Sequence, residues 1–211
     1  MASAPTGQHA VPAQLLFLPG ASGSTAFWQP LAERLTHPTE RRILGWPGFG
    51  PTPADPTING FDDLVALVTG ALDRPSALIA QSMGGLIALL AALERPQMIT
   101  HLVLTVTSGG LDMAEHGAED WRPAFIASQP AVPPWFAAAD INLTHRLPAL
   151  DVPTLLVWGD ADPISPLSVG RQLEALLPRA KLRVIPGADH DLAFSHAAEL
   201  APMIEAHLAT P

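Results

Sequence analysis

Three short stretches of this chain carry residue types that could together perform nucleophilic chemistry. They are a motif centred on Ser82 and two polar segments, 159–163 and 186–191. In the motif, Ser82 comes just after the apolar run 77–80 and is followed by Gly84 and Gly85. A serine at a sharp strand-to-helix corner has a strained backbone and needs small neighbours, and Ala80 and Gly84 are small. The motif therefore predicts a nucleophile elbow, in which the serine hydroxyl stands clear of a sheet, near free helix N–H groups that could stabilise an oxyanion.

A serine hydroxyl reacts only if a base takes its proton, and that base must be oriented by a third group. Asp160 and Asp162 follow the apolar segment 155–158, and His190 follows the next apolar segment. The chain order serine, aspartate, histidine is the one that the elbow predicts. Taken singly, Ser82 could be a helix cap, His190 a solvated loop residue, and either aspartate a cap of the helix after it. The agreement of three placements favours catalysis.

The elements that must position these residues alternate between buried strands and amphipathic helices. Near-continuous apolar strands separated by such helices indicate a parallel sheet that is covered on both faces. We predict a single α/β domain over residues 1–211 with a doubly wound, mainly parallel sheet of about six strands. The predicted strands are 14–18, 42–46, 77–80, 102–106, 153–158 and 182–185. The predicted helices are 26–35, 61–72, 86–93, 166–177 and about 196–208.

Residues 108–148 break this alternation and predict a small lid. An insertion there follows the fourth strand at the carboxyl edge of the sheet, where open α/β sheets bind ligands. The four large aromatic residues of this segment could line an acyl pocket or anchor the lid to the body of the protein. After the first strand, Phe27 and Trp28 could pack in the core or form a wall of the pocket. We predict that the substrate contacts are Trp28, Trp121, Phe125, Trp135 and Phe136.

Composition bounds the protein class. The 211 residues are 48% hydrophobic and 15% charged, which is typical of a compact globular protein. The net charge of −9 argues against nucleic acid and anionic membrane surfaces as partners. Cysteine is absent, the other histidines show no metal-ligand spacing, and neither a signal peptide nor a membrane span is visible. We expect a cytoplasmic protein with no metal; the sequence does not indicate its oligomeric state.

Together these motifs resemble the α/β-hydrolase family over nearly the whole chain, from Leu15 to Leu208. In that family the catalytic acid closes a G-x-x-D loop, which corresponds to Asp162, with Asp160 as the competing candidate. The histidine closes a G-x-x-H loop, which corresponds to His190. The turn at 47–50, P-G-F-G, and the S-x-G-G elbow are similar to those of small carboxylesterases related to the pimeloyl-carrier-protein methyl ester esterase.

The resemblance implies a minimal version of the fold that lacks the N-terminal strand pair and has a short helical lid. It also implies an oxyanion hole made by the backbone N–H groups of Ala21 and Met83. Three departures from the family pattern are Ala80 at the first motif glycine, Pro19 where a loop histidine is usual, and Gly45-Trp46 before the P-G-F-G turn.

The function that these residues imply is serine-dependent hydrolysis of a small-molecule carboxylic ester, with no cofactor. Thioester cleavage and C–C bond hydrolysis can use the same residues, since a fold alone does not select a reaction. A small-ligand receptor or signalling protein on the same fold is the alternative from another class.

Overall fold

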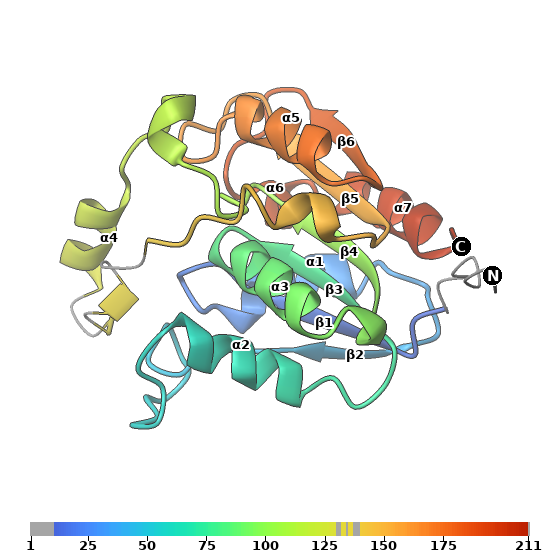
Figure 1. Ribbon diagram of the computed structural model, residues 1–211, viewed down its shortest axis with the longest axis horizontal. Coiled ribbons are helices and arrows are strands. Elements are labelled where there is room, and N and C mark those ends of the chain that lie inside the picture. Colours follow the sequence, from blue (N-terminus) through green and yellow to red (C-terminus); the bar gives the residue numbers. More distant parts are fainter. Residues whose placement is uncertain (1–10, 130–131, 134, 137–139, 211) are drawn as a thin grey trace, which may run out of the picture.

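A sheet of six parallel strands, in the order β2-β1-β3-β4-β5-β6, forms the centre of the protein (Figure 1). The structure is a computed structural model that describes residues 11–129, 132–133, 135–136 and 140–210. The four inner strands are buried along their whole length, because helices cover both faces of the sheet. The strands are β1 Gln14–Leu18, β2 Glu40–Ile43, β3 Ser76–Gln81, β4 Ile99–Thr105, β5 Thr154–Gly159 and β6 Ala180–Ile185.

The register of the inner strands aligns apolar side chains across the sheet. Phe17 of β1 pairs with Ile79 of β3, which pairs with Val103 of β4, which in turn pairs with Leu155 of β5. All four residues are buried, so this row is part of the hydrophobic core. The parallel arrangement places the carboxyl ends of all strands at one edge, and Ser82 follows β3 there.

Helices lie on both faces of the sheet. In Figure 1, α2, α3 and α5 lie in front of it, and α1, α6 and α7 lie behind it. The prediction of a doubly wound parallel sheet is therefore confirmed. The α-helices are α1 Gln29–Ala32, α2 Phe61–Gly70, α3 Met83–Glu94, α4 Arg122–Ser128, α5 Leu167–Leu176, α6 Leu192–Ser195 and α7 Ala197–Leu208. The short 3-10 helices are η1 Thr25–Trp28, η2 Pro96–Met98, η3 Met113–His116 and η5 Leu147–Ala149.

Two predicted elements differ from the observed ones. The predicted helix 26–35 is split into η1 and α1, because Pro30 lacks an N–H group and fits only the first turn of an α-helix. The second strand ends at Ile43, and Trp46 belongs to the following loop. There the Trp46 side chain is buried, and its Nε1–H donates to the Pro19 carbonyl at 2.8 Å.

The segment between β4 and β5 contains α4, which lies to one side of the sheet (Figure 1). Of the predicted lid 108–148, residues 130–131, 134 and 137–139 lie outside the described residues. None of the helices within the described ranges is long and apolar enough to cross a membrane.

Candidate active site

Ser82 occupies the corner between β3 and α3. Its backbone has φ 52° and ψ −121°, a conformation that non-glycine residues rarely adopt. The Ser82 N–H donates to the Thr105 carbonyl at 3.0 Å, and the Gly85 N–H donates to the Ser82 carbonyl at 3.0 Å. A Cβ atom on Gly84 would collide with the carbonyl oxygens of Leu18 and Pro19. The glycine therefore allows α3 to approach the end of β1, and the elbow depends on that approach.

His190 lies in the loop after β6 and reaches Ser82 across two intervening strands. Its Nε2 is 3.0 Å from the Ser82 Oγ, and its Nδ1 is 2.8 Å from the Asp162 Oδ2. A carboxylate can only accept a hydrogen bond, so the imidazole proton belongs on Nδ1. Nε2 is then the acceptor that faces the serine hydroxyl, which is the protonation state that a general base requires.

Asp162, in the loop after β5, holds the imidazole from a fully buried side chain. Its Oδ1 accepts the N–H groups of Ile164 at 2.8 Å and Ser165 at 3.1 Å, which leaves Oδ2 for His190. These bonds both fix the carboxylate and compensate its removal from water.

Asp160, the competing candidate, makes no contact with the imidazole. Its Oδ1 accepts the Gly187 N–H at 2.6 Å, so this exposed carboxylate connects the aspartate loop to the histidine loop. Gly159 lets the two loops touch, because a Cβ atom there would collide with the Ala188 backbone. The structure therefore brings Asp162, and not Asp160, to His190.

Both expected oxyanion donors lie beside the serine. Ala21 lines the cavity at Ser82, and a Cβ on the preceding Gly20 would stand 3.2 Å from the Ser82 Cβ. Met83 is the first residue of α3, so its N–H has no partner within the helix.

A cavity of about 190 Å³ opens at Ser82 and His190. Its walls are mainly apolar, and two of the predicted contacts from the lid, Trp121 and Phe125, belong to them. The residues that line it are Gly20, Ala21, Ser22, Phe27, Gln81, Ser82, Trp121, Phe125, Ile164, His190 and Asp191.

The other three predicted contacts, Trp28, Trp135 and Phe136, are not among the lining residues. Trp28 is fully buried with its ring 5.6 Å from that of Phe17, so it is a core residue, and its neighbour Phe27 faces the cavity instead. Trp135 and Phe136 both pack edge-on against Phe49 and against other rings of the α2 end and the lid. They anchor the lid segment to the body of the protein.

Gln81 is a buried polar site residue that sequence reasoning missed, and the lining residues Phe27, Ile164 and Asp191 were not among the predicted contacts either. The Gln81 side chain is almost completely buried, lines the cavity and donates from Nε2 to the His190 carbonyl at 3.3 Å. A Cβ on Gly20 would collide with its amide oxygen, so the first loop also packs on it. The available signal was a polar residue at the end of an otherwise apolar strand, directly before Ser82.

The sequence of the chain is similar to those of known proteins. Residues 15–140 match the sequence model described as the alpha/beta hydrolase family, and residues 134–197 match the one described as the alpha/beta hydrolase fold. The chain is 26% identical to the pimeloyl-[acyl-carrier protein] methyl ester esterase of Aliivibrio salmonicida (strain LFI1238), over 88% of each chain. It is 25% identical to the protein of the same name from Aeromonas salmonicida (strain A449), over 90% of this chain and 93% of that one.

Solved structures share the fold. A thermophilic esterase from Thermogutta terrifontis superposes with a TM-score of 0.73 at 23% identity, over 92% of this chain and 89% of that one. The meta-cleavage product hydrolase of Pseudomonas fluorescens IP01 superposes with a TM-score of 0.74 at 18% identity, over 92% and 89%. At these identities the likeness concerns the fold alone.

Proposed function

Because the chain belongs to the alpha/beta hydrolase family, we propose that it is a serine hydrolase that cleaves a small carboxylic ester through an acyl-enzyme intermediate. The observation that carries the proposal is the hydrogen-bonded series from Ser82 through His190 to Asp162, with distances of 3.0 and 2.8 Å. The fold and the esterase-named relatives support hydrolase activity. The catalytic roles below are our assignment.

In the first half of the reaction, Ser82 Oγ attacks the ester carbonyl while His190 Nε2 takes the hydroxyl proton. The negative charge moves onto the carbonyl oxygen, where the N–H groups of Ala21 and Met83 stabilise it. The C–O bond to the alcohol then breaks, and the imidazolium returns its proton to the leaving oxygen. Asp162 stabilises the imidazolium and keeps its orientation throughout.

In the second half, water replaces the alcohol. His190 takes a proton from the water as it attacks the acyl carbonyl, and the proton then returns to Ser82 Oγ as the acyl–enzyme bond breaks. The products are an alcohol and a carboxylic acid, and the enzyme returns to its starting protonation state. Apart from the attacking water, the proposed steps use only side chains and backbone groups of this chain.

The choice of an ester follows from the relatives' names, since two of those described above are named as methyl ester esterases. Thioester and C–C bond cleavage use the same residues and are the alternatives within this reaction class. A small-ligand receptor or signalling protein that keeps the fold and the triad is the alternative from another class; it should react slowly with a fluorophosphonate, and its Ser82→Ala variant should keep partner binding.

The test is hydrolysis of p-nitrophenyl esters by the wild-type protein and by Ser82→Ala. We expect turnover that falls by roughly 10⁴-fold or more in the variant, because the nucleophile is lost. Ser22→Ala is the matched control, since Ser22 lines the same cavity and its side chain makes only a 3.4 Å contact with the Ser24 N–H. A fluorophosphonate should label the wild type and the control but not Ser82→Ala. Turnover that survives in Ser82→Ala would refute the proposal.

A further inference from the structure

Among the described residues, no arginine or lysine lines the cavity at Ser82. Its walls are the apolar side chains of Phe27, Trp121, Phe125 and Ile164, and the charged group that lines it is the exposed carboxylate of Asp191. Protein sites that bind carboxylates or phosphates usually do so with arginine or lysine. The volume of about 190 Å³ is also below the roughly 300–1,000 Å³ typical of small-molecule pockets. The cavity suits a short, uncharged acyl group.

Acidic residues outnumber basic ones around the cavity. We use the term mouth loops for the described residues of the connections at the carboxyl ends of the strands, which are residues 19–28, 44–60, 106–129, 132–133, 135–136, 140–146, 160–166 and 186–191. These segments contain ten aspartate or glutamate residues but only two arginines, Arg122 and Arg146, and no lysine. The Arg122 Nε is 3.0 Å from the Asp120 Oδ1, so that charge is paired. Exposed carboxylates of the mouth loops include Glu119, Asp120, Asp160, Asp189 and Asp191.

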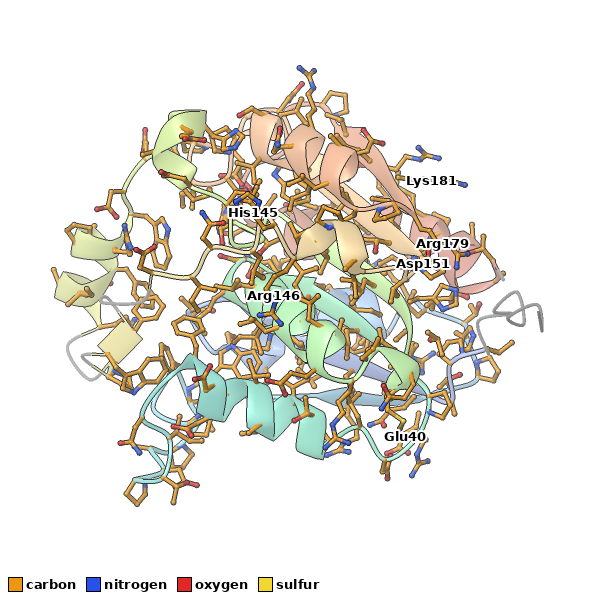
Figure 2. All side chains as sticks on the ribbon, viewed as in Figure 1. Glu40, His145, Arg146, Asp151, Arg179 and Lys181 are labelled. Atoms are coloured by element: carbon orange, nitrogen blue, oxygen red, sulfur yellow. The ribbon has the colours of Figure 1, made fainter. Side chains whose placement is uncertain are left out.

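The positive charges lie mostly elsewhere. Arg41, Arg74, Arg95, Arg179 and Lys181 are in or just before the first residues of strands, at the opposite edge of the sheet. Figure 2 labels Arg179 and Lys181, which lie at the end of the molecule opposite α4, together with Asp151. Figure 2 shows Arg146 near the middle of the view. Charges of both signs therefore occupy the far end, whereas acidic residues outnumber arginines in the mouth loops.

We propose that the site selects uncharged esters with a short apolar acyl group and discriminates against esters that carry an anion. This inference rests on the proposed ester hydrolysis. An anionic substrate would approach several carboxylates of the mouth loops beside an apolar cavity, where water screens the repulsion less than in bulk solvent. Of the two arginines of the mouth loops, Arg122 is paired with Asp120, and none of the residues that line the cavity is an arginine or a lysine. A neutral ester meets neither obstacle.

The test compares two substrates of nearly equal size, each with one ester bond and the same acetyl group, para-acetoxyacetophenone and para-acetoxybenzoate. We expect kcat/KM to be at least about tenfold lower for the anion at about 10 mM ionic strength, after correction for the rates of alkaline hydrolysis. The gap should narrow at about 1 M salt, because screening then acts over roughly 3 Å. Equal kcat/KM values at low salt would overturn the inference.

Two variants test whether carboxylates of the mouth loops cause the discrimination against the anionic ester. Asp120→Asn removes a mouth carboxylate and leaves Arg122 unpaired, so kcat/KM for the anion should rise several-fold relative to the neutral ester. Asp73→Asn removes one of the two acidic partners of Arg74 at the other end of the sheet, where the Asp73 Oδ1 is 2.9 Å from the Arg74 Nε and Glu40 remains as the second partner. It should leave the ratio unchanged, and an equal change in both variants would overturn the inference. Absence of Ser82-dependent turnover of the neutral ester would instead refute the proposed function.

Discussion

Replacing Asp162 by asparagine tests the assigned geometry most directly, because it changes charge and proton position while keeping size. Asparagine Oδ1 can still accept the N–H groups of Ile164 and Ser165. Its NH₂ group then faces His190 Nδ1, where the carboxylate Oδ2 lies 2.8 Å away in the native protein. Since an amide nitrogen only donates, Nδ1 must become the acceptor and the imidazole proton must move to Nε2. Nε2 can then no longer accept the proton of Ser82.

The expected loss is large, because two effects add. The imidazole is held in the wrong tautomer, and the imidazolium that forms during the reaction loses a buried carboxylate at 2.8 Å. Together these should lower kcat by about 10³–10⁴-fold. That range corresponds to about 4–5.5 kcal/mol of transition-state stabilisation.

Asp160→Asn is the matched control, two residues away. An asparagine carbonyl can keep the hydrogen bond from the Gly187 N–H, and the side chain does not touch His190. We expect a loss of less than about tenfold, since only an exposed charge is removed.

The assay is kcat for Ser82-dependent hydrolysis of p-nitrophenyl acetate, with thermal melting of each variant to verify folding. The rate of fluorophosphonate labelling gives a second readout of how well Ser82 is activated. A larger loss in Asp160→Asn than in Asp162→Asn would exchange the two assignments. A folded Asp162→Asn variant within tenfold of the wild type would refute the proposed role of the carboxylate.

Two further predictions concern stability. Burial, reinforced by the nearby His101, lowers the pKa of His207 from 6.5 to about 4, so the unfolded chain binds a proton in this range that the folded protein does not. Stability contributed by this group is present above about pH 6.5 and is lost as the pH falls. Between about pH 7.5 and about pH 5 we expect the free energy of unfolding, measured with urea, to fall by about 2 kcal/mol because of this group. His207→Gln should lack this part of the fall, and an equal fall in both proteins would contradict the prediction. Gly84→Ala should cost about 1–3 kcal/mol, because its Cβ would meet backbone carbonyls that cannot give way, whereas Gly70→Ala, with open space around it, should be nearly neutral in thermal melts. Similar losses in the two glycine variants would contradict the steric argument.

Most of the fold could be predicted because its elements carry strong local signals. The strand Gln14–Leu18 was predicted at its observed bounds, since a short apolar run ending at Pro19-Gly20 has few other interpretations. The segment 26–35 misled because its apolar spacing is helical, although the position of Pro30 allows an α-helix only from Gln29. The second strand was displaced because Trp46 is as apolar as a strand residue but is buried by a loop.

The candidate site divides in the same way. Ser82 and His190 could be named from motifs, because a strained corner and a strand-end loop each require particular neighbours in sequence. The sequence could not tell that Phe27 and Phe125 line the cavity whereas Trp28 and Phe136 are buried in the core. Their side chains have similar hydrophobicity, and only the direction in which the backbone points them distinguishes the two roles.

By itself the sequence determined the parallel sheet, the order of the reactive residues along it and their common edge, because these follow from periodicity and chain order. Only the tertiary structure decided which aspartate faces His190. Asp160 and Asp162 are two residues apart in one loop, and the backbone N–H groups of Ile164 and Ser165 orient the second inward while Gly187 binds the first. Such choices depend on contacts between segments far apart in the chain, which no local pattern records.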